Sequence, residues 1–456
     1  MSALVIGPHP SRAEPATPPA TTAAPAPAIV APDSDVYGAG ALAATSFSGT
    51  KLQGDGVAPG VDPVTKTVLD TDGVTLRIYE PNDLGGPFAG QMLNPAPSLA
   101  LKARDIGHVF GLAFDNEPTA DTVIPGLYAA ATSLFGLNIV GPDKDADGQP
   151  DRLKKGAPGA KFVDGQFGPD PDGGPGAIWK IERASGKVSL FLSIGSGGHK
   201  NSGAGIGGLA FDPKSRTLYA SDLDTGLIHR LSVAQRADLG QFDHGLIGRP
   251  LRGKPALADD GERLNIESPD FDTAKPETWG ITQLERRIDA LAVHDGRLFY
   301  AVAEGPQIWS VGLRLDGGFA GDVRFEAGIE SEKPYPVTSI AFDLAGNMIV
   351  AQRGFIQNPA DYSAFVEAGP AQVLRLKPET PEKPDTPGLW VQKDPQEYAA
   401  GETKEHRTAS GGLTLHYAYK SDGTLDTATC NGTIVFSTDA IGAPDCASSC
   451  ARSAAP

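Results

Sequence analysis

Ile206-Gly-Gly-Leu-Ala-Phe-Asp212 is the stretch that decides the fold, because close variants of it recur along the chain. The variants read Phe110-Gly-Leu-Ala-Phe-Asp115, Ile288-Asp-Ala-Leu-Ala-Val-His294 and Val337-Thr-Ser-Ile-Ala-Phe-Asp343. After each comes a second apolar segment, such as Leu218-Tyr219-Ala220, and then a third, such as Leu227-Ile-His-Arg-Leu231. Short strands that repeat with turn residues between them indicate a repeat architecture.

The repeat favours a β-propeller, an all-β fold of blades arranged in a ring. Small residues before Leu-Ala-Phe fit the innermost strand of a blade, where neighbouring strands approach closely. The chain of 456 residues holds 56 Gly and 39 Pro, so turns are frequent and long helices are not expected. Trp179 and Trp309 stand at matching points of the third strand, and we expect both to pack between blades.

Two weaker units bring the expected number of four-stranded blades to about six. Ala41-Leu-Ala-Ala-Thr-Ser-Phe47 predicts the first strand of the earlier unit, and the alternating segment 74–79 predicts its third strand. The later unit begins at Leu413 and turns at Asp422-Gly423 and Asn431-Gly432.

Uneven spacing predicts long loop insertions between or within the blades. We expect them over 141–176 and 234–287, with a connector over 378–388. A cryptic blade inside 234–287 would make seven blades instead of six. The Ala/Pro-rich residues 1–36 predict a disordered tether, residues 37–436 the propeller, and residues 437–456 a cysteine-containing tail.

The strand pattern over roughly residues 40–436 resembles six-bladed propellers of the NHL and gluconolactonase/regucalcin type. The resemblance is one of strand order, and no family-specific catalytic motif accompanies it. His199 followed by Gly207-Gly208 is faintly similar to pyrroloquinoline-quinone sugar dehydrogenases, although the spacing here is longer.

Charge and cysteine content restrict the partners and the compartment. The formal net charge is -17, which disfavours nucleic acid, and no apolar run is long enough for membrane insertion. The tether and the acidic balance suggest a secreted or periplasmic protein, although no clear signal peptide is present. In an oxidising compartment, Cys430 could pair with Cys446 or Cys450, which leaves one thiol over. The oligomeric state is not determined by the sequence.

One loop has the spacing of a calcium site. Acidic side chains at positions one, three and five can surround a hard cation, and glycine at position six permits the turn. Lys154 stands at the twelfth position, where an EF-hand has a bidentate glutamate, so we expect modest affinity and a structural role. The alternative is a solvated turn. The expected ligands are Asp143, Asp145, Asp147, Gln149 and Asp151.

Strand direction predicts which polar residues share one face of the propeller. A loop that enters a first strand lies on the same face as a loop that joins a second strand to a third, because neighbouring strands are antiparallel. This places a possible ligand face, or a metal site, at His199, Asp222, Asp224, Glu304 and Arg353. The alternative is that these are ordinary surface groups in Gly-rich loops.

Two functions fit this sequence best, and a quinone-dependent dehydrogenase is a distant third. The first is an exported, non-catalytic propeller that binds a protein or a glycan and has a calcium-stabilised loop. The alternative is a metal-dependent lactonase or esterase that uses Asp222 and Glu304 as ligands in the central channel. The channel distinguishes them: converging carboxylates favour the hydrolase, and an apolar or blocked channel favours the binding module.

Overall fold

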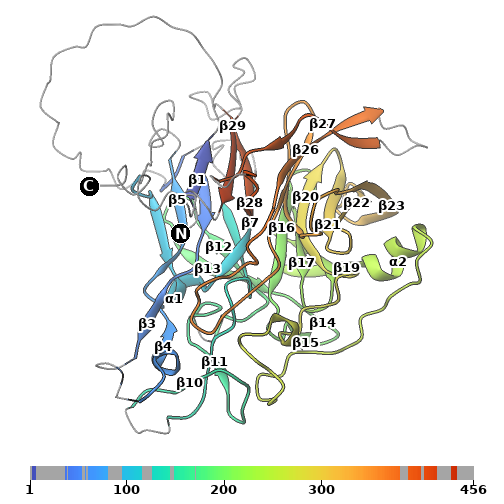
Figure 1. The fold of residues 1–456 in the computed structure, drawn as a ribbon. Coiled ribbons are helices and arrows are strands. Elements are labelled where there is room, and N and C mark those ends of the chain that lie inside the picture. Colours follow the sequence, from blue (N-terminus) through green and yellow to red (C-terminus); the bar gives the residue numbers. More distant parts are fainter. Residues whose placement is uncertain are drawn as a thin grey trace, which may run out of the picture.

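The computed structural model describes residues 3–6, 36–38, 40–53, 57, 60–80, 95–115, 126–143, 148–169, 171–380, 389–401, 405–417 and 433–438. Nearly all regular structure in these residues is antiparallel β-sheet (Figure 1). The cysteines Cys430, Cys446 and Cys450 and the expected turns at Asp422 and Asn431 lie outside them. No helix in the described part is both long enough and apolar enough to cross a bilayer.

Four sheets have four strands each, and in every one the strands lie in chain order. The sheets are β7 (Val109–Phe114), β8 (Leu127–Ala131), β12 (Ala177–Ile181) and β13 (Val188–Ser193); β16 (Ile206–Asp212), β17 (Thr217–Asp222), β18 (Leu227–Ser232) and β19 (Ala237–Asp243); β20 (Ile288–His294), β21 (Arg297–Val302), β22 (Gln307–Leu313) and β23 (Phe319–Gly328); and β24 (Val337–Phe342), β25 (Met348–Gln352), β26 (Val373–Thr380) and β27 (Leu389–Tyr398). Each repeat of the sequence phrase is therefore a first strand.

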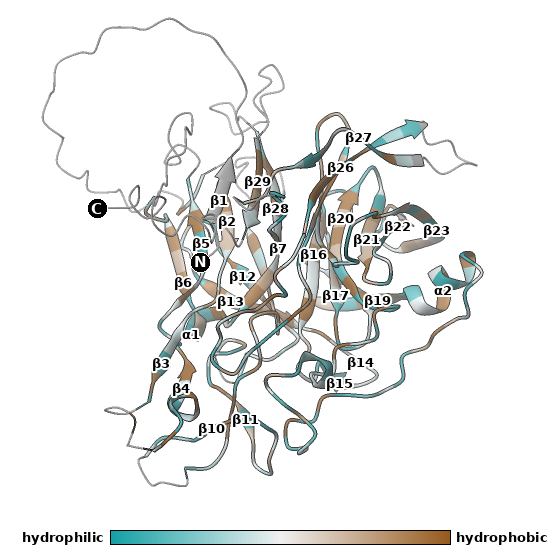
Figure 2. Ribbon diagram, viewed as in Figure 1, coloured by the Kyte–Doolittle hydropathy of each residue, from teal (hydrophilic) through white to brown (hydrophobic). Residues whose placement is uncertain are grey.

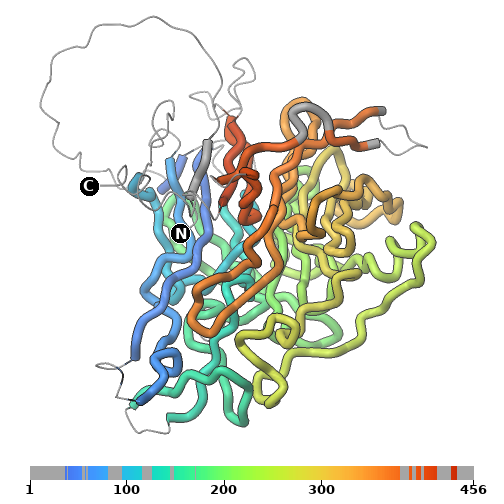
Figure 3. The backbone as a smooth tube through the Cα atoms, in the orientation of Figure 1, coloured from blue at the N-terminus to red at the C-terminus, as the bar shows by residue number. Residues whose placement is uncertain are grey.

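The first strands face one another around a common axis. β7 contacts β16, β16 contacts β20, β20 contacts β24, and β24 contacts β28 (Ala409–His416). Figure 3 shows the sheets following each other around the molecule in chain order. Sheets of meandering strands joined through their first strands make a β-propeller, as the sequence predicts.

Two three-stranded sheets flank the four complete blades. One contains β2 (Leu42–Thr45), β5 (Val74–Tyr79) and β6 (Leu99–Lys102); the other contains β28, β29 (Thr433–Thr438) and β1 (Ala3–Ile6). They meet in a small cluster where Leu42 and Val435 are both buried. Six blades remain the prediction, because each flanking sheet shows three strands among the described residues.

The direction of β2 differs from the expectation. The chain after β2 reaches His108 at the beginning of β7, with Ser48 Oγ 3.0 Å from His108 Nε2. In the complete blades, the end of a second strand lies beside the start of the first. β2 therefore runs as a second strand and β5 as a third, so the assignment of 41–47 to a first strand is wrong and that of 74–79 to a third is confirmed.

β1 lies within the segment for which we expected a disordered tether. Its backbone pairs with β29, from Ala3 opposite Thr438 to Ile6 opposite Val435. An exposed strand edge offers unpaired N–H and C=O groups to any extended segment, which is the physical reason for such pairing. The boundaries at residues 36 and 436 remain predictions.

The insertions carry the small elements. β3 (Thr50–Leu52), η1 (Pro63–Lys66) and β4 (Thr67–Leu69) join β2 to β5, and α1 (Ala103–Ile106) precedes β7. β9 (Ile139–Val140), β10 (Arg152–Leu153) and β11 (Lys161–Phe162) join β8 to β12, and β14 (Gly195–Ser196) and β15 (His199–Lys200) precede β16. The expected insertion at 234 starts later, at α2 (His244–Leu251), because β19 completes its blade first. Residues 244–287, all described, contain α2 and η3 (Pro276–Thr278) but no strand, so they form no seventh blade.

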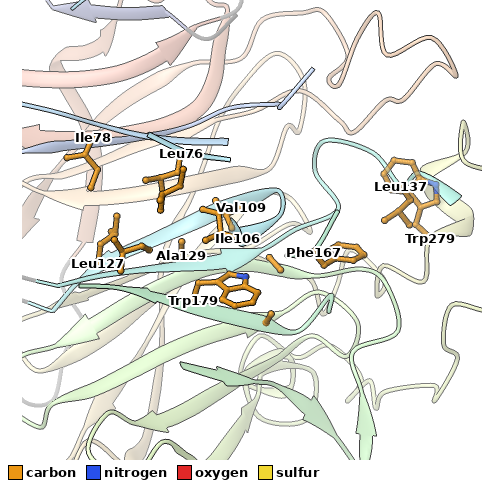
Figure 4. Close-up of a cluster of buried hydrophobic side chains, with 14 of the residues drawn as sticks. Leu76, Ile78, Ile106, Val109, Leu127, Ala129, Leu137, Phe167, Trp179 and Trp279 are labelled. Carbon is orange, nitrogen blue, oxygen red and sulfur yellow. The ribbon is translucent and has the colours of Figure 1, made fainter. Parts of the chain in front are cut away.

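The core lies between blades, and strand alternation divides it. Leu218 and Ala220 pack in the cluster toward the preceding blade, whereas Tyr219 packs in the cluster toward the next one. This requires apolar side chains on both faces, and Figure 2 colours much of β6, β7 and β20 as hydrophobic. Trp179 and Trp309 are 2% and 1% exposed, which confirms their packing role; Figure 4 shows Trp179 beside Val109 and Ala129.

Glycine is required where the first strands meet. A Cβ on Gly207 would lie 2.6 Å from the carbonyl oxygen of Ile288, and one on Gly208 would lie 2.9 Å from the amide nitrogen of Leu291. Both contacts are shorter than van der Waals packing allows. The Gly-Gly of the deciding phrase is thus explained by the approach of two first strands at the axis.

Candidate binding site

The face at which the first strands begin, called here the mouth face, carries the functional candidates. Register places the start of each first strand beside the end of the second, as for Ile206 opposite Asp222 and Val337 opposite Gln352. The same strands each have a register shift near this end, for example between Ile288 and Ala290. Such irregularities redirect side chains and are frequent next to binding sites.

Residues 354–369, called here the arm, extend from the end of β25 over the mouth face. The arm is a hairpin, since Gln357 donates to the carbonyl of Phe365 and Glu367 donates to that of Phe355. At its base, a Cβ on Gly354 would lie 2.2 Å from the carbonyl oxygen of Glu367, so only glycine fits.

Hydrogen bonds tie the arm to other blades. Arg152 Nη2 donates to the carbonyl of Ala360 (2.7 Å), and Asn138 Nδ2 donates to Tyr362 Oη (2.6 Å). Asn358 Nδ2 donates to the carbonyl of Thr273 (2.9 Å), which lies in the long loop before β20. The arm of one blade therefore rests on the insertions of two others.

Aromatic rings from separate segments meet beneath the arm. The ring of Phe47 stacks on His108 and on Tyr362, with centroids 5.3 Å apart in both pairs. Phe365 lies 4.6 Å from Phe47 and 5.8 Å from Phe135, centroid to centroid. Contacts of this kind each contribute about 0.5–1.5 kcal/mol beyond the burial of their area.

His108 is neutral within this cluster. It is fully buried, and burial lowers the pKa of its imidazole to about 3. Its Nε2 accepts from the Ser48 amide (3.4 Å) and lies 3.0 Å from Ser48 Oγ. The proton consequently sits on Nδ1.

Charged groups near the axis are paired. Arg287 Nε donates to Asp289 Oδ2 (3.1 Å), and both side chains are buried. Burial raises the pKa of Asp289, while Arg287 and Arg353 oppose that rise. Arg353 Nη2 also donates to the carbonyl of Leu134 (2.9 Å), a bond across the mouth between two blades.

The other expected ligand-face residues divide into separate networks. His199 is exposed on the β14–β15 hairpin. Glu304 accepts from Arg249 and Lys254, both at 2.6 Å. Asp224 accepts from the amide and the hydroxyl of Ser202, at 3.1 and 2.6 Å. The structure places these groups on the mouth face without bringing them together.

Asp222 belongs to a buried network with His229. Its carboxylate accepts from Asn201 Nδ2 (2.7 Å) and lies 3.7 Å from His229 Nε2, while His229 Nδ1 lies 2.7 Å from Asp238 Oδ2. Burial alone would lower the pKa of His229, but the two carboxylates outweigh it and raise the pKa to about 9. His229 is thus a cation at neutral pH. Burial raises the pKa of the neighbouring Asp224 to about 6.

The expected calcium loop is described in part, since Asp145 and Asp147 lie in the undescribed residues 144–147. Asp143 Oδ2 accepts from the amide of Gly148 (2.9 Å), whose φ is +82°, the left-handed conformation that position six requires. Asp151 lies 3.4 Å from Lys66 Nζ. Gln149 follows Gly148 in an exposed bend.

The alternative function requires carboxylates that converge on a metal ion. Among the described residues, no group of three or more His, Cys, Asp or Glu side chains has an arrangement that could hold a metal ion. Asp222 and Glu304, the ligands that a hydrolase would need, are held by separate sets of partners. The mouth offers hydrogen bonds and ring faces instead.

No protein-family model matches the sequence, and no curated protein does. Solved structures give faint likenesses. A nidogen/laminin complex has a TM-score of 0.27 and 12% identity, covering 59% of this chain and 72% of that one. A gluconolactonase from Xanthomonas campestris has 0.23 and 16%, covering 39% and 45%. A PQQ-bound aldose sugar dehydrogenase from Streptomyces coelicolor has 0.24 and 16%, covering 74% and 98%. Likenesses this low assign no function, and the propeller assignment depends on the strand topology above.

The sequence reading missed the arm and its ring cluster. Phe135, Tyr362 and Phe365 stand in loops without periodicity, so no strand or helix pattern marks them. One signal was present: Phe355, Tyr362 and Phe365 put three aromatic residues into one connection. Exposed loops rarely hold so many large apolar side chains, and such a loop is expected to pack on something.

Proposed function

We propose that this chain is an exported, non-catalytic β-propeller whose mouth face binds a glycan or a protein. One observation carries the proposal: the arm of one blade packs on insertions of two others at the mouth face, over rings from separate segments. Hydrogen-bonding groups and aromatic faces line this contact, and both are typical of recognition surfaces. Fold alone does not establish the function, so the proposal depends on this geometry.

Calcium is part of the same proposal. A cation held by Asp143, Asp145, Asp147, Gln149 and Asp151 would fix the turn between β9 and β10. Gly148, at position six of the loop, has the left-handed conformation that a calcium loop requires there, which supports this role. The role is structural, because the turn precedes Arg152, the residue that anchors the arm.

The hydrolase reading has less support from the described residues. It requires carboxylates that converge on the axis, whereas Glu304 forms ion pairs with Arg249 and Lys254. Freeing that carboxylate for a metal would leave two cationic groups without their partner. Breaking these ion pairs would cost free energy, whereas a preformed metal site already has its carboxylates free to bind the metal.

Two measurements on the purified full chain test the proposed function. The first is a screen of lactone and ester hydrolysis with and without added divalent cations, and we expect no turnover above buffer. The second is binding to an array of glycans and extracellular-type proteins, where we expect at least one specific ligand. Cation-dependent turnover that Asp222→Asn or Glu304→Gln abolishes, and that the exposed-site control Asp316→Asn leaves intact, would show that the hydrolase is correct.

A further inference from the structure

Besides Nε of the Arg152 guanidinium, three buried polar atoms of uncharged side chains at the contact between the arm and the mouth have no hydrogen-bond partner among the described residues. They are His108 Nδ1 and Asn138 Oδ1 on the mouth and Asn358 Oδ1 on the arm. The three side chains are 0%, 0% and 1% exposed. A buried polar group that lacks a partner is destabilising, and each instance in a native protein calls for an explanation.

These three groups share one neighbourhood. Gln166 joins the first two, since its Oε1 accepts from the Asn138 amide and its carbonyl accepts from the His108 amide, both at 2.8 Å. The amide of Asn358 lies against Gly136, where an added Cβ would be 2.6 Å from Asn358 Nδ2. Gly136 also accepts from Gln166 Nε2 (3.4 Å). The free donor of His108 and the free acceptors of Asn138 and Asn358 therefore lie around Gly136 and Gln166.

The arm holds a strained residue at this contact. Tyr362 has a φ of +56°, a conformation that side chains with a Cβ rarely adopt and that costs about 1–3 kcal/mol. Its ring lies 4.9 Å from the Arg152 guanidinium and stacks on Phe47. The turn that carries this φ lies within the arm, since the Tyr362 amide donates to the carbonyl of Pro359 (2.8 Å).

Unpaired polar atoms at an interface lower the free energy needed to separate its two sides. The arm can move as a unit, because its own hydrogen bonds join Gln357 to Phe365 and Glu367 to Phe355. Its base narrows at Gly354, beside the end of β25. The rest of that blade keeps its pairing when the arm moves, since β25 and β26 are joined to each other directly.

We propose that residues 354–369 form a lid, and that the mouth beneath it binds the ring of a neutral sugar. The inference rests on the proposed function and specifies its ligand class. Hydroxyl groups donate to Asn138 Oδ1 and Asn358 Oδ1, and a hydroxyl oxygen accepts from His108 Nδ1–H. The apolar face of the sugar packs on the rings of Phe47 and Phe135, which both contact His108 and have centroids 6.5 Å apart.

A neutral ligand fits the charges of this region. His108 is uncharged, Asn138 and Asn358 are amides, and the Arg152 guanidinium beside Tyr362 already donates to three backbone carbonyls. An anion would need a paired cationic donor, and a metal ion would need anionic ligands. The three free atoms need two donors and one acceptor from a ligand, and the hydroxyl groups of a sugar supply both kinds.

Hydrogen–deuterium exchange of the full chain tests the lid without any ligand. We expect the amides of Gln357 and Glu367 to exchange faster than those of β25 and β26, because a hairpin held by so few bonds frays once it has left the mouth, whereas opening leaves the blade intact. Exchange of the arm only together with β25 and β26 would overturn the lid.

Calorimetry and the same exchange measurement with glucose, galactose, mannose, N-acetylglucosamine and cellobiose test the ligand class. We expect at least one sugar to bind and to slow exchange in the arm. His108→Phe keeps the stacked ring and removes the donor, so Kd should rise about tenfold, which corresponds to about 1.4 kcal/mol. The matched control is His294→Phe, because His294 stacks on Phe342 with ring centroids 4.1 Å apart, in another part of the ring, and it should bind as the wild type does.

The thermal midpoint separates this role from a structural one. His108→Phe also removes the Nε2 acceptor of Ser48 and should lower the midpoint under either role, so the comparison is made with sugar present. The sugar that binds should raise the midpoint of the wild type and of His294→Phe, and should raise that of His108→Phe by less. Asn358→Ala is the second variant and should also weaken sugar binding. If no sugar alters exchange in the arm, the sugar site is overturned, and ordered water alone satisfies these atoms. The proposed function survives that result if a protein ligand binds on the array.

Discussion

Arg152 offers the sharpest test of how the mouth is held together. The side chain is 3% exposed, and its guanidinium donates to the carbonyls of Val64 (3.0 Å), Thr67 (2.8 Å) and Ala360 (2.7 Å). It therefore joins the β3–β4 segment, the insertion after β8 and the arm at a single point. Burial lowers the pKa of Arg152. A guanidinium nevertheless stays charged in proteins.

The size of the effect follows from these bonds. A hydrogen bond from a charged donor contributes about 1.5–3 kcal/mol, so the three together contribute about 4–9 kcal/mol before desolvation. Removing the buried guanidinium recovers several kcal/mol of its desolvation free energy. We expect Arg152→Met to destabilise this junction by about 3 kcal/mol, and Arg152→Lys to retain part of that, because one ammonium cannot reach three carbonyls.

Hydrogen exchange in the arm and in residues 60–69, together with urea unfolding, measures this effect. A local loss of about 3 kcal/mol speeds exchange there by about a hundredfold. The control is Arg104→Met, because Arg104 forms an exposed ion pair with Asp72 and should change stability by less than about 0.5 kcal/mol. Equal effects of Arg152→Met and Arg104→Met on these amides would refute the anchoring role.

Three further predictions concern the ring, the buried histidine and the calcium loop. Gly207→Ala should destabilise by about 1–3 kcal/mol in urea unfolding, because the new Cβ would lie 2.6 Å from the Ile288 carbonyl oxygen. Gly111→Ala should destabilise less, because its Cβ would lie 3.1 Å from the Gly207 carbonyl oxygen. The pKa of His229 is about 9 in the fold and 6.5 unfolded, so its stabilisation is complete below pH 6.5 and is lost as pH rises through 9; urea midpoints should fall over that range in the wild type but not in His229→Gln. Calcium should raise the thermal midpoint of the wild type by mass action, and Asp143→Ala should abolish that rise; equal rises in both would remove the calcium assignment.

Much of the scaffold could be predicted from the sequence. The phrase ending at Asp212 encodes strand alternation, small residues at the axis and a turn in a few consecutive positions. Those are local properties, and they reappear in β7, β16, β20 and β24. The place of residues 41–47 was harder to predict, because direction within a sheet depends on which distant strand it meets.

The candidate site was far less accessible to sequence reasoning. The sequence predicts Asp222 and Glu304 near one face, and their partners, Asn201 and Arg249, come from different loops. The position of a residue relative to the strands predicts on which face of the propeller it lies, but it does not predict which group pairs with its charge. The ring cluster beneath the arm joins residues as far apart as Phe47 and Phe365, and no periodic pattern records that contact.

The sequence by itself determined a ring of β-meanders, because short-range alternation and turn chemistry act within each unit. Only the tertiary structure decided that the arm covers the mouth, since that arrangement depends on single contacts between loops, such as the one from Asn138 to Tyr362. The strands repeat, so the same pattern of apolar and small residues is required in every blade and can be recognised in the sequence. Each loop contacts its partner loop only once, so no repeated sequence pattern predicts that contact.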